Sequence, residues 1–216
     1  MNCLVVAATA LEIGPFLEQY RTKNKLSPAV SVDILVTGIG LTATTYSLTR
    51  QLAIKRPTMI IQAGIGGCFD RTVPLGSVFA IKQEAIADQG VIEKNELRTL
   101  FDLGLVRPNQ APFSKGWLVN KSDLLEKSRL KKVKGISVNE ISTSKQKINS
   151  YKATFDPVTE SMEGAALHYV CLMEKIPFVQ LRAVSNYIGE RNKKNWNLEE
   201  SIINLNNELS VLLDKL

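Results

Sequence analysis

The chain has 216 residues, of which 44% are hydrophobic and 22% charged, a composition typical of one soluble globular domain. Its formal net charge is +6, but only 6% of its residues are aromatic. Nucleic-acid binding is therefore disfavoured, because it typically uses a basic surface with aromatic side chains between the basic ones. No apolar run is long enough to cross a membrane. We therefore expect a single domain over residues 1–216, with neither nucleic acid nor membrane as a partner.

The cysteines and the single histidine limit the metal chemistry. Cys3, Cys68 and Cys171 are far apart in apolar surroundings, which favours reduced core cysteines over disulfides or metal ligands. His168 alone cannot form a histidine-based metal cluster. The N-terminal stretch lacks the basic region of a signal peptide, and Glu12 interrupts its apolar residues. These features predict a cytoplasmic protein.

Apolar runs of strand length alternate with segments of helical spacing along the chain. The first half predicts strands at 3–8, 32–36, 58–62 and 77–81, and helices at 11–20 and 42–54. Residues 84–114 are rich in turn residues and predict loops. The last part predicts a helix at 158–174, a strand at 178–184 and an amphipathic helix at 198–213. Continuous apolar strands between helices indicate an α/β sheet that is covered on both faces.

Two of the predicted strands run into glycine-rich sequences, TGIG at Thr37–Gly40 and AGIGG at Ala63–Gly67. Neither sequence fits a dinucleotide-binding or phosphate-cradling motif, so each alone predicts only a tight turn from strand to helix. Two such turns at neighbouring strand ends predict a shared ligand crevice.

Two acids are candidates for chemistry. Glu12 follows the first strand; its spacing favours an exposed acid in the first helical turn over a general base at the mouth of the sheet. Glu163 lies in TESMEGAALHYV. A purely structural role explains this stretch completely, with Ser161 as the cap of a helix and Glu163 as an acid near its first turn. Met162 and Glu163 also pair a thioether with a carboxylate, which suits the apolar face and the hydroxyls of a sugar. We expect His168 to pack in the core.

The stretches SMEGAA (161–166) and PFVQLRAVSN (177–186) resemble the purine nucleosidase and nucleoside phosphorylase superfamily, in particular its methylthioadenosine/S-adenosylhomocysteine nucleosidases. Glu12, both glycine sequences and ISTSKQKI at Ile141–Ile148 occur in the order of that family over most of the chain. The resemblance implies a nucleoside phosphorylase-like fold, a three-layer α/β/α domain with a central mixed twisted sheet. It also implies a small purine nucleoside as ligand, a homo-oligomer and no cofactor.

The resemblance assigns roles residue by residue. Glu12 matches the acid that activates the attacking water, and Met162 and Glu163 match the ribose-binding pair. The remaining matched positions contact the purine and its surroundings: Gly66, Gln146, Lys147, Ile148, Ser185 and Asn186.

Asn186 departs from the pattern of the adenine-cleaving enzymes, which have an acid at this position. A carboxamide can donate to an exocyclic carbonyl oxygen while its own oxygen accepts N7–H, which suits hypoxanthine and makes Asn186 a catalytic candidate. The segment SNYIGERNKKNW (185–196) is similar to the futalosine hydrolase branch. That likeness implies hydrolysis of futalosine to hypoxanthine and dehypoxanthine futalosine in menaquinone biosynthesis.

Three alternatives remain open on the sequence. The first is a methylthioadenosine/S-adenosylhomocysteine nucleosidase or another purine nucleosidase that tolerates Asn186. The second is a phosphorylase, which needs a basic clamp near the glycine sequences, where Arg71 is the only candidate. The third is a non-catalytic protein that binds or stores a nucleoside, against which the retained Glu12 and Glu163 argue.

Overall fold

The computed structural model describes residues 1–22, 30–94 and 96–216. Its strands are β1 (Asn2–Ala7), β2 (Ser31–Val36), β3 (Met59–Cys68), β4 (Val78–Ile86), β5 (Gly90–Glu93), β6 (Glu96–Thr99), β7 (Leu118–Val119), β8 (Lys132–Ser137), β9 (Thr159–Ser161) and β10 (Phe178–Tyr187). Its helices are α1 (Gly14–Thr22), α2 (Leu41–Ile54), α3 (Leu124–Lys127), α4 (Lys145–Phe155), α5 (Gly164–Glu174) and α6 (Leu198–Leu213), with a short 3₁₀ helix, η1 (Lys193–Asn195).

Within these described residues, eight strands form one mixed sheet, and β5 and β6 form a separate hairpin. The order β10-β4-β8-β9-β3-β1-β2 is joined by a further β10–β3 pairing, so five strands close into a ring, while β1 and β2 extend it. The β1–β2, β1–β3 and β10–β3 pairs are parallel, whereas β10–β4 and β3–β9 are antiparallel. The prediction of a central mixed sheet is confirmed.

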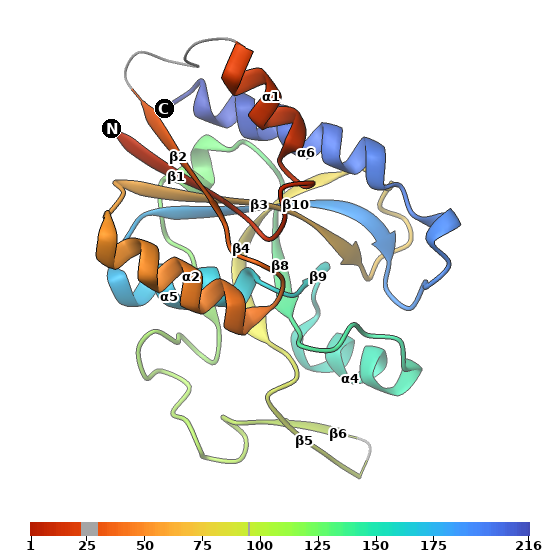
Figure 1. Cartoon of the computed structure of the whole chain (residues 1–216). Helices are drawn as coiled ribbons and strands as arrows, with labels where there is room; N and C mark the ends of the chain where they lie inside the picture. The colour runs from red at the N-terminus through yellow and green to blue at the C-terminus, as the bar shows by residue number, and fades with distance from the viewer. Residues whose placement is uncertain (23–29, 95) are drawn as a thin grey trace.

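Helices cover both faces of this sheet, with α1 and α6 on one side and α2 and α5 on the other (Figure 1). Successive residues of β1 divide between the two cores, as the alternation of a strand requires. Val5 packs in the cluster that includes Phe16 of α1, and Val6 packs in the cluster that includes Leu48 of α2 and Leu167 of α5. The predicted three-layer α/β/α architecture is therefore confirmed. None of the described helices is both long enough and apolar enough to span a bilayer.

The second glycine sequence does not form the predicted turn. Ala63–Gly67 lies inside β3, which runs unbroken to Cys68. This strand continues because β10 pairs with it in parallel as far as Cys68, while β9 pairs with Gly67 and Cys68 from the other side. Long-range pairing on both edges overrides the local tendency of glycine to turn the chain.

The predicted helix at 158–174 is wrong in its first part. Residues 159–161 form strand β9, which pairs with β8 in parallel and with β3 antiparallel, and α5 begins only at Gly164. The predicted helix at 11–20 also starts later, at Gly14, so Glu12 lies in the preceding turn. The predicted loop region 84–114 contains the end of β4 and the β5–β6 hairpin, and Asn95 lies outside the described residues.

Candidate active site

A cavity of about 380 Å³ opens where the parallel strands β1, β3 and β10 end. Ligands of α/β proteins commonly bind at this edge of the sheet. Ile39 of the first glycine sequence and Gly66 of the second both line it, as expected for a shared crevice. The complete lining is Ala8, Thr9, Leu11, Glu12, Ile39, Ile65, Gly66, Gly67, Ile141, Glu160, Ser161, Met162, Glu163, Ser185, Asn186, Ile188, Arg191, Trp196, Leu198 and Ile202.

Glu12 is buried at the wall of this cavity, with 7% of its surface exposed. One carboxylate oxygen, Oε2, accepts hydrogen bonds from the backbone N and Oγ1 of Thr9 at 2.9 and 3.1 Å. The other, Oε1, accepts from the backbone N of Ile65 in β3 at 3.1 Å. The expectation of an exposed helix-start acid is therefore wrong, because the turn after β1 folds this side chain back against β3. The carboxylate is fixed in position and can accept a proton from a ligand or a water.

Glu163 stands at the start of α5 with 5% of its surface exposed. Its Oε1 accepts from the backbone N of Gly40 at 3.1 Å, and its Oε2 lies 3.3 Å from Nη1 of Arg182. Gly40 has a φ of 97°, a conformation that side chains rarely adopt, so the first glycine sequence supplies this donor. Ser161 Oγ accepts from the backbone N of Gly164 at 3.2 Å, which helps to start the helix.

Arg182 is a residue that the sequence interpretation missed. It lies within β10, is 1% exposed, and donates from Nη1 to the carbonyl of Ile65 and from Nη2 to Oε1 of Gln62, at 3.2 and 3.1 Å. A Cβ atom at Gly64 would overlap Arg182 Nη1, so this glycine makes room for the guanidinium. An arginine inside an apolar strand is a usable sequence signal, because a buried cation requires partners.

Asn186 and Ser185 also line the cavity, and a register shift between Val184 and Asn186 brings Asn186 opposite Gly67 of β3. Ser185 Oγ donates to Asn186 Oδ1 at 2.9 Å, and Asn186 Nδ2 donates to the carbonyl of Tyr187 at 3.2 Å. A carboxamide has two donor hydrogens and two acceptor lone pairs. One donor and one acceptor position of Asn186 are thus left for a ligand.

Of the other residues matched by resemblance, some line the cavity and some do not. Met162 and Gly66 line the cavity, whereas Gln146, Lys147 and Ile148 lie in the first turn of α4 and are not among its lining residues. Lys147 instead pairs with Glu140, with Nζ 2.5 Å from Oε2. The structure therefore does not place these three α4 residues with the cavity-lining set.

Ile141, from the same motif, does reach the cavity. Its neighbour Ser142 is held by Glu160, whose carboxylate accepts from the backbone N and Oγ of Ser142 at 3.0 and 2.5 Å. Burial raises the pKa of Glu160. This acid thus anchors the loop that brings Ile141 to the wall.

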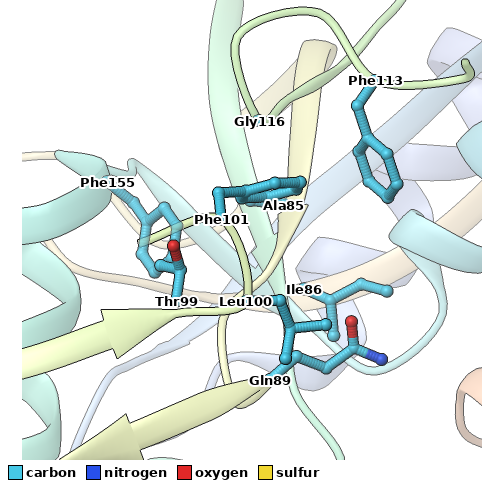
Figure 2. A pocket seen from close by; sticks show the side chains of 9 residues that line it. All are labelled: Ala85, Ile86, Gln89, Thr99, Leu100, Phe101, Phe113, Gly116 and Phe155. Carbon is cyan, nitrogen blue, oxygen red and sulfur yellow. The ribbon is translucent and has the colours of Figure 1, made fainter. Parts of the chain in front are cut away.

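A second hollow, near the β5–β6 hairpin, is unsuited to catalysis (Figure 2). Its volume is about 20 Å³, roughly the room that one water needs. It is lined by Ala85, Ile86, Gln89, Thr99, Leu100, Phe101, Phe113, Gly116 and Phe155, a set without acid, base or thiol. The cavity of about 380 Å³, whose lining includes the buried acids Glu12 and Glu163, is the candidate active site.

Comparison with known proteins identifies the family of this chain. The model of the phosphorylase superfamily matches residues 14–214. A 5'-methylthioadenosine/S-adenosylhomocysteine nucleosidase of Haemophilus influenzae is 27% identical over 93% of this chain and 91% of its own length. A futalosine hydrolase of Thermus thermophilus is also 27% identical, over 78% of this chain and 75% of its own.

Solved structures show the same fold. The native futalosine hydrolase of Helicobacter pylori superposes with a TM-score of 0.84 at 17% identity, covering 100% of this chain and 98% of that one. A mutant methylthioadenosine nucleosidase of the same organism, with 5'-methylthioadenosine in its active site, gives 0.83 at 18% identity, covering 100% and 99%. The chain belongs to the phosphorylase superfamily. Within it, the chain is an enzyme of the N-glycosyl hydrolase class, the class of both kinds of curated relative.

Proposed function

We propose that this enzyme hydrolyses the N-ribosidic bond of futalosine, releasing hypoxanthine and dehypoxanthine futalosine, as a step of menaquinone biosynthesis. The observation that carries the proposal is the carboxamide of Asn186 in the wall of a cavity that also holds Glu12 and Glu163. Futalosine hydrolases among the relatives support the same choice.

The proposed mechanism assigns one task to each acid. Glu12, fixed by Thr9 and Ile65, polarises the attacking water and accepts its proton. Glu163 accepts hydrogen bonds from the ribose hydroxyls, and the Met162 thioether covers the apolar face of the sugar. Cleavage of such a bond passes through a transition state resembling an oxocarbenium ion, which a nearby carboxylate stabilises.

Asn186 handles the leaving base in this proposal. Its free N–H donates to the carbonyl oxygen of hypoxanthine as the bond from C1 of the ribose to the base breaks. The base leaves as an anion and takes a proton from solvent water at N7, after which the free lone pair on Oδ1 of Asn186 accepts from N7–H. The bond from the amide N–H to the carbonyl oxygen strengthens as negative charge moves into the ring, so it favours the transition state over the bound substrate.

One group of lining residues suits the aromatic carboxylate that futalosine carries. Arg191 lines the cavity, and its guanidinium lies 5.5 Å from the centroid of the Trp196 ring, which also lines it. Leu198 and Ile202 of α6 add apolar surface beside them. A cation and an indole next to an apolar wall match a benzoate-like group.

A 5'-methylthioadenosine/S-adenosylhomocysteine nucleosidase is the second candidate. The specific observation in its favour is the wider coverage by the Haemophilus influenzae relative, 93% of this chain against 78% for the futalosine hydrolase. A phosphorylase has less support, because Arg71 packs over the Tyr187 ring and is not among the residues that line the cavity.

One assay separates these activities. The purified protein is incubated with futalosine, methylthioadenosine and inosine, with and without phosphate, and the released base and sugar are identified. We expect hypoxanthine from futalosine, with a free hydroxyl at the sugar C1 and no dependence on phosphate. Release of adenine alone supports the second candidate, a sugar phosphate indicates a phosphorylase, and binding without cleavage indicates a storage protein.

We also propose that the protein forms a homo-oligomer and is located in the cytoplasm. Leu11 and Ile39 line the cavity yet are 71% and 62% exposed, which suits a surface that a second copy covers. Light scattering on the purified protein measures the mass, and a monomer at assay concentration contradicts the homo-oligomer.

A further inference from the structure

Four polar side chains form a buried row behind Glu163, outside the cavity lining. They are Glu84 of β4, His168 of α5, and Gln180 and Arg182 of β10, each at most 1% exposed. Burial of so many polar groups is costly unless every one is hydrogen-bonded. The proposed mechanism gives a task to none of these side chains.

Gln180 is the centre of the row. In the amide orientation that satisfies all its neighbours, its oxygen accepts from Nε of Arg182 at 3.0 Å. Its nitrogen donates to Nε2 of His168 at 2.9 Å and to Oε2 of Glu84 at 3.1 Å. Arg182 in turn meets Glu163 through Nη1. A hydrogen-bonded path therefore runs from His168 and Glu84 to the carboxylate that faces the cavity.

His168 determines the orientation of the Gln180 amide. Its Nδ1 lies 3.0 Å from the carbonyl of Leu118, which can only accept, so Nδ1 carries the proton. Burial lowers the pKa of His168 to about 4, so the ring is neutral near pH 7 and its Nε2 is an acceptor. Nε2 therefore requires the nitrogen side of the Gln180 amide, which turns the oxygen toward Arg182.

Glu84 supports the same orientation from the opposite strand. Its Oε2 accepts from Gln180, and its Oε1 accepts from Ser137 Oγ at 2.9 Å. That hydroxyl accepts from the backbone N of Ala165, in the first turn of α5, at 2.8 Å. The acid thus ties the Gln180 amide to the start of the helix that presents Glu163.

We propose that Gln180 is a positioning residue for ribose binding: it fixes Arg182 through Nε, so that Arg182 holds the Glu163 carboxylate in place for the sugar hydroxyls. His168 and Glu84 set the amide of Gln180 and act only through it. The inference rests on the proposed function in one respect, the assignment of Glu163 to the ribose.

Gln180→Met, a change of similar volume, tests the inference. It leaves Nε of Arg182 without its acceptor, so Arg182 keeps only its bonds to Gln62 and Ile65 and holds Glu163 less firmly. We expect KM for the cleaved nucleoside to rise about tenfold, the equivalent of about 1.4 kcal/mol, while kcat changes less and inhibition by free hypoxanthine is unchanged. An unchanged KM in a folded variant overturns the proposal.

Asn120→Leu is the matched control. Asn120 is also a buried amide that bonds to β10, donating from Nδ2 to the carbonyl of Phe178 at 2.8 Å, but its side-chain hydrogen bonds go to Phe178 and Ser122 rather than to the row. It should lower Tm without changing KM. Equal KM changes in both variants would mean that Gln180 has only a structural role.

Gln180→Glu adds a pH signature that a structural role does not produce. The introduced carboxylate faces Glu84, with His168 and Glu163 of α5 and Arg182 of β10 as the other titratable or charged neighbours. When it shares a proton with Glu84, it can still accept from Arg182 and bond to Glu84. We expect near wild-type KM at low pH and a steep rise when the shared proton is lost, whereas a KM that is independent of pH contradicts the inference.

A readout without turnover keeps the inference separate from the proposed function. The Nε–H signal of Arg182 in nuclear magnetic resonance, assigned by its loss in Arg182→Lys, should be protected from exchange in the wild type and lose protection in Gln180→Met. If the wild type cleaves no nucleoside, the proposed function fails, and this comparison still decides whether Gln180 holds Arg182. Unchanged protection overturns the positioning role.

Discussion

Arg182 Nη1 lies 3.3 Å from Glu163 Oε2, and the two side chains are 1% and 5% exposed. Both charges of this pair are buried, and each also has a backbone partner. The backbone N of Gly40 donates to the carboxylate of Glu163, and the guanidinium of Arg182 donates to the carbonyl of Ile65. Removing one member of a buried pair leaves the other uncompensated, which is far more costly than the pair itself is stabilising. The pair therefore couples the stability of the fold to the residue proposed to bind ribose.

The first prediction follows from this pair. Glu163→Ala should lower the free energy of unfolding by roughly 3–5 kcal/mol, because it strands the charge of Arg182. Glu163→Gln keeps an acceptor and should stay folded, yet weaken nucleoside binding much more than binding of free hypoxanthine. Denaturant titration and calorimetric binding on the same preparations measure both effects. Equal weakening for nucleoside and base would contradict the assignment of Glu163 to the sugar.

The second prediction concerns the proposed base. Glu12→Gln keeps an oxygen that can accept from Thr9 or Ile65 but cannot take a proton from water at neutral pH. We expect a folded protein that binds the nucleoside and turns it over ~10²–10⁴-fold more slowly. Single-turnover kinetics separate this loss from binding. Near-normal turnover by the folded variant removes Glu12 from the mechanism.

The third prediction tests base choice at Asn186. Asn186→Asp loses both donor hydrogens, so it should slow cleavage of a 6-oxopurine nucleoside and narrow its advantage over the matched 6-aminopurine nucleoside. An unsatisfied buried group costs roughly 1–3 kcal/mol, which corresponds to about 5- to 150-fold in the ratio of kcat/KM. The ratio is measured for both proteins with inosine and adenosine or with futalosine and its amino analogue. An unchanged ratio means that the base is selected elsewhere.

The fourth prediction concerns the carboxylate end of the substrate. Arg191→Met keeps an apolar side chain next to Trp196 but removes the cation. KM for futalosine should rise about tenfold, as expected for loss of about 1.4 kcal/mol, while KM for inosine, which has no carboxylate, should not change. Lys194→Met, in the neighbouring η1, is the matched control, because Lys194 does not line the cavity. A parallel change for both substrates would show that Arg191 does not recognise the carboxylate.

The fifth prediction is a pH dependence of stability. Burial raises the pKa of Glu84 from 4.5 to about 7, so between these values the native state holds a proton that the unfolded state has released. The contribution of Glu84 to the free energy of unfolding therefore falls as pH rises through this window and is constant above it, by a few kcal/mol in all. His168, whose pKa falls from 6.5 to about 4, opposes this trend below pH 6.5.

Comparison with Glu84→Gln isolates the effect of the acid, since the variant resembles the protonated form at every pH. Thermal unfolding of both proteins from pH 5 to pH 8 measures it. The stability of the variant relative to the wild type should increase from pH 5 to about pH 7 and be constant from there to pH 8. A difference independent of pH would show that Glu84 does not take up its proton on folding.

The local spacing of apolar residues was sufficient to predict the elements that bury one continuous face. Helix α6 has the predicted bounds, Leu198–Leu213, because its apolar spacing is regular along the whole helix. Strand β9 was missed because three residues hold no periodicity of their own and become a strand only by pairing with β8 and β3. The turn expected at Ala63–Gly67 failed for the same reason, since its pairing partners are distant in the sequence.

The site was predicted in the same uneven way. Glu12, Met162 and Glu163 were identified from short motifs, and the structure brings them to one cavity. Arg182 could be noticed as a cation within an apolar strand, but the sequence does not reveal that its partner is Glu163 or that Gln180 bonds to His168 and Glu84, because these come from other elements. Contacts between side chains that are far apart in the sequence produce no periodic pattern, so they cannot be predicted from one sequence.

The glycines of β3 set limits on how this enzyme can be re-engineered. A Cβ atom at Gly64 would overlap Arg182, one at Gly67 would overlap Ile188, and one at Gly66 would lie 2.8 Å from the carbonyl of Glu160. Libraries that vary Gly64 or Gly66 would consist mostly of inactive or misfolded members, whereas at Gly67 only the terminal methyl group of Ile188 would have to move. Substrate scope is better altered from helix α6, at Leu198 and at Ile202, which line the cavity with side chains that can be exchanged for larger or smaller ones.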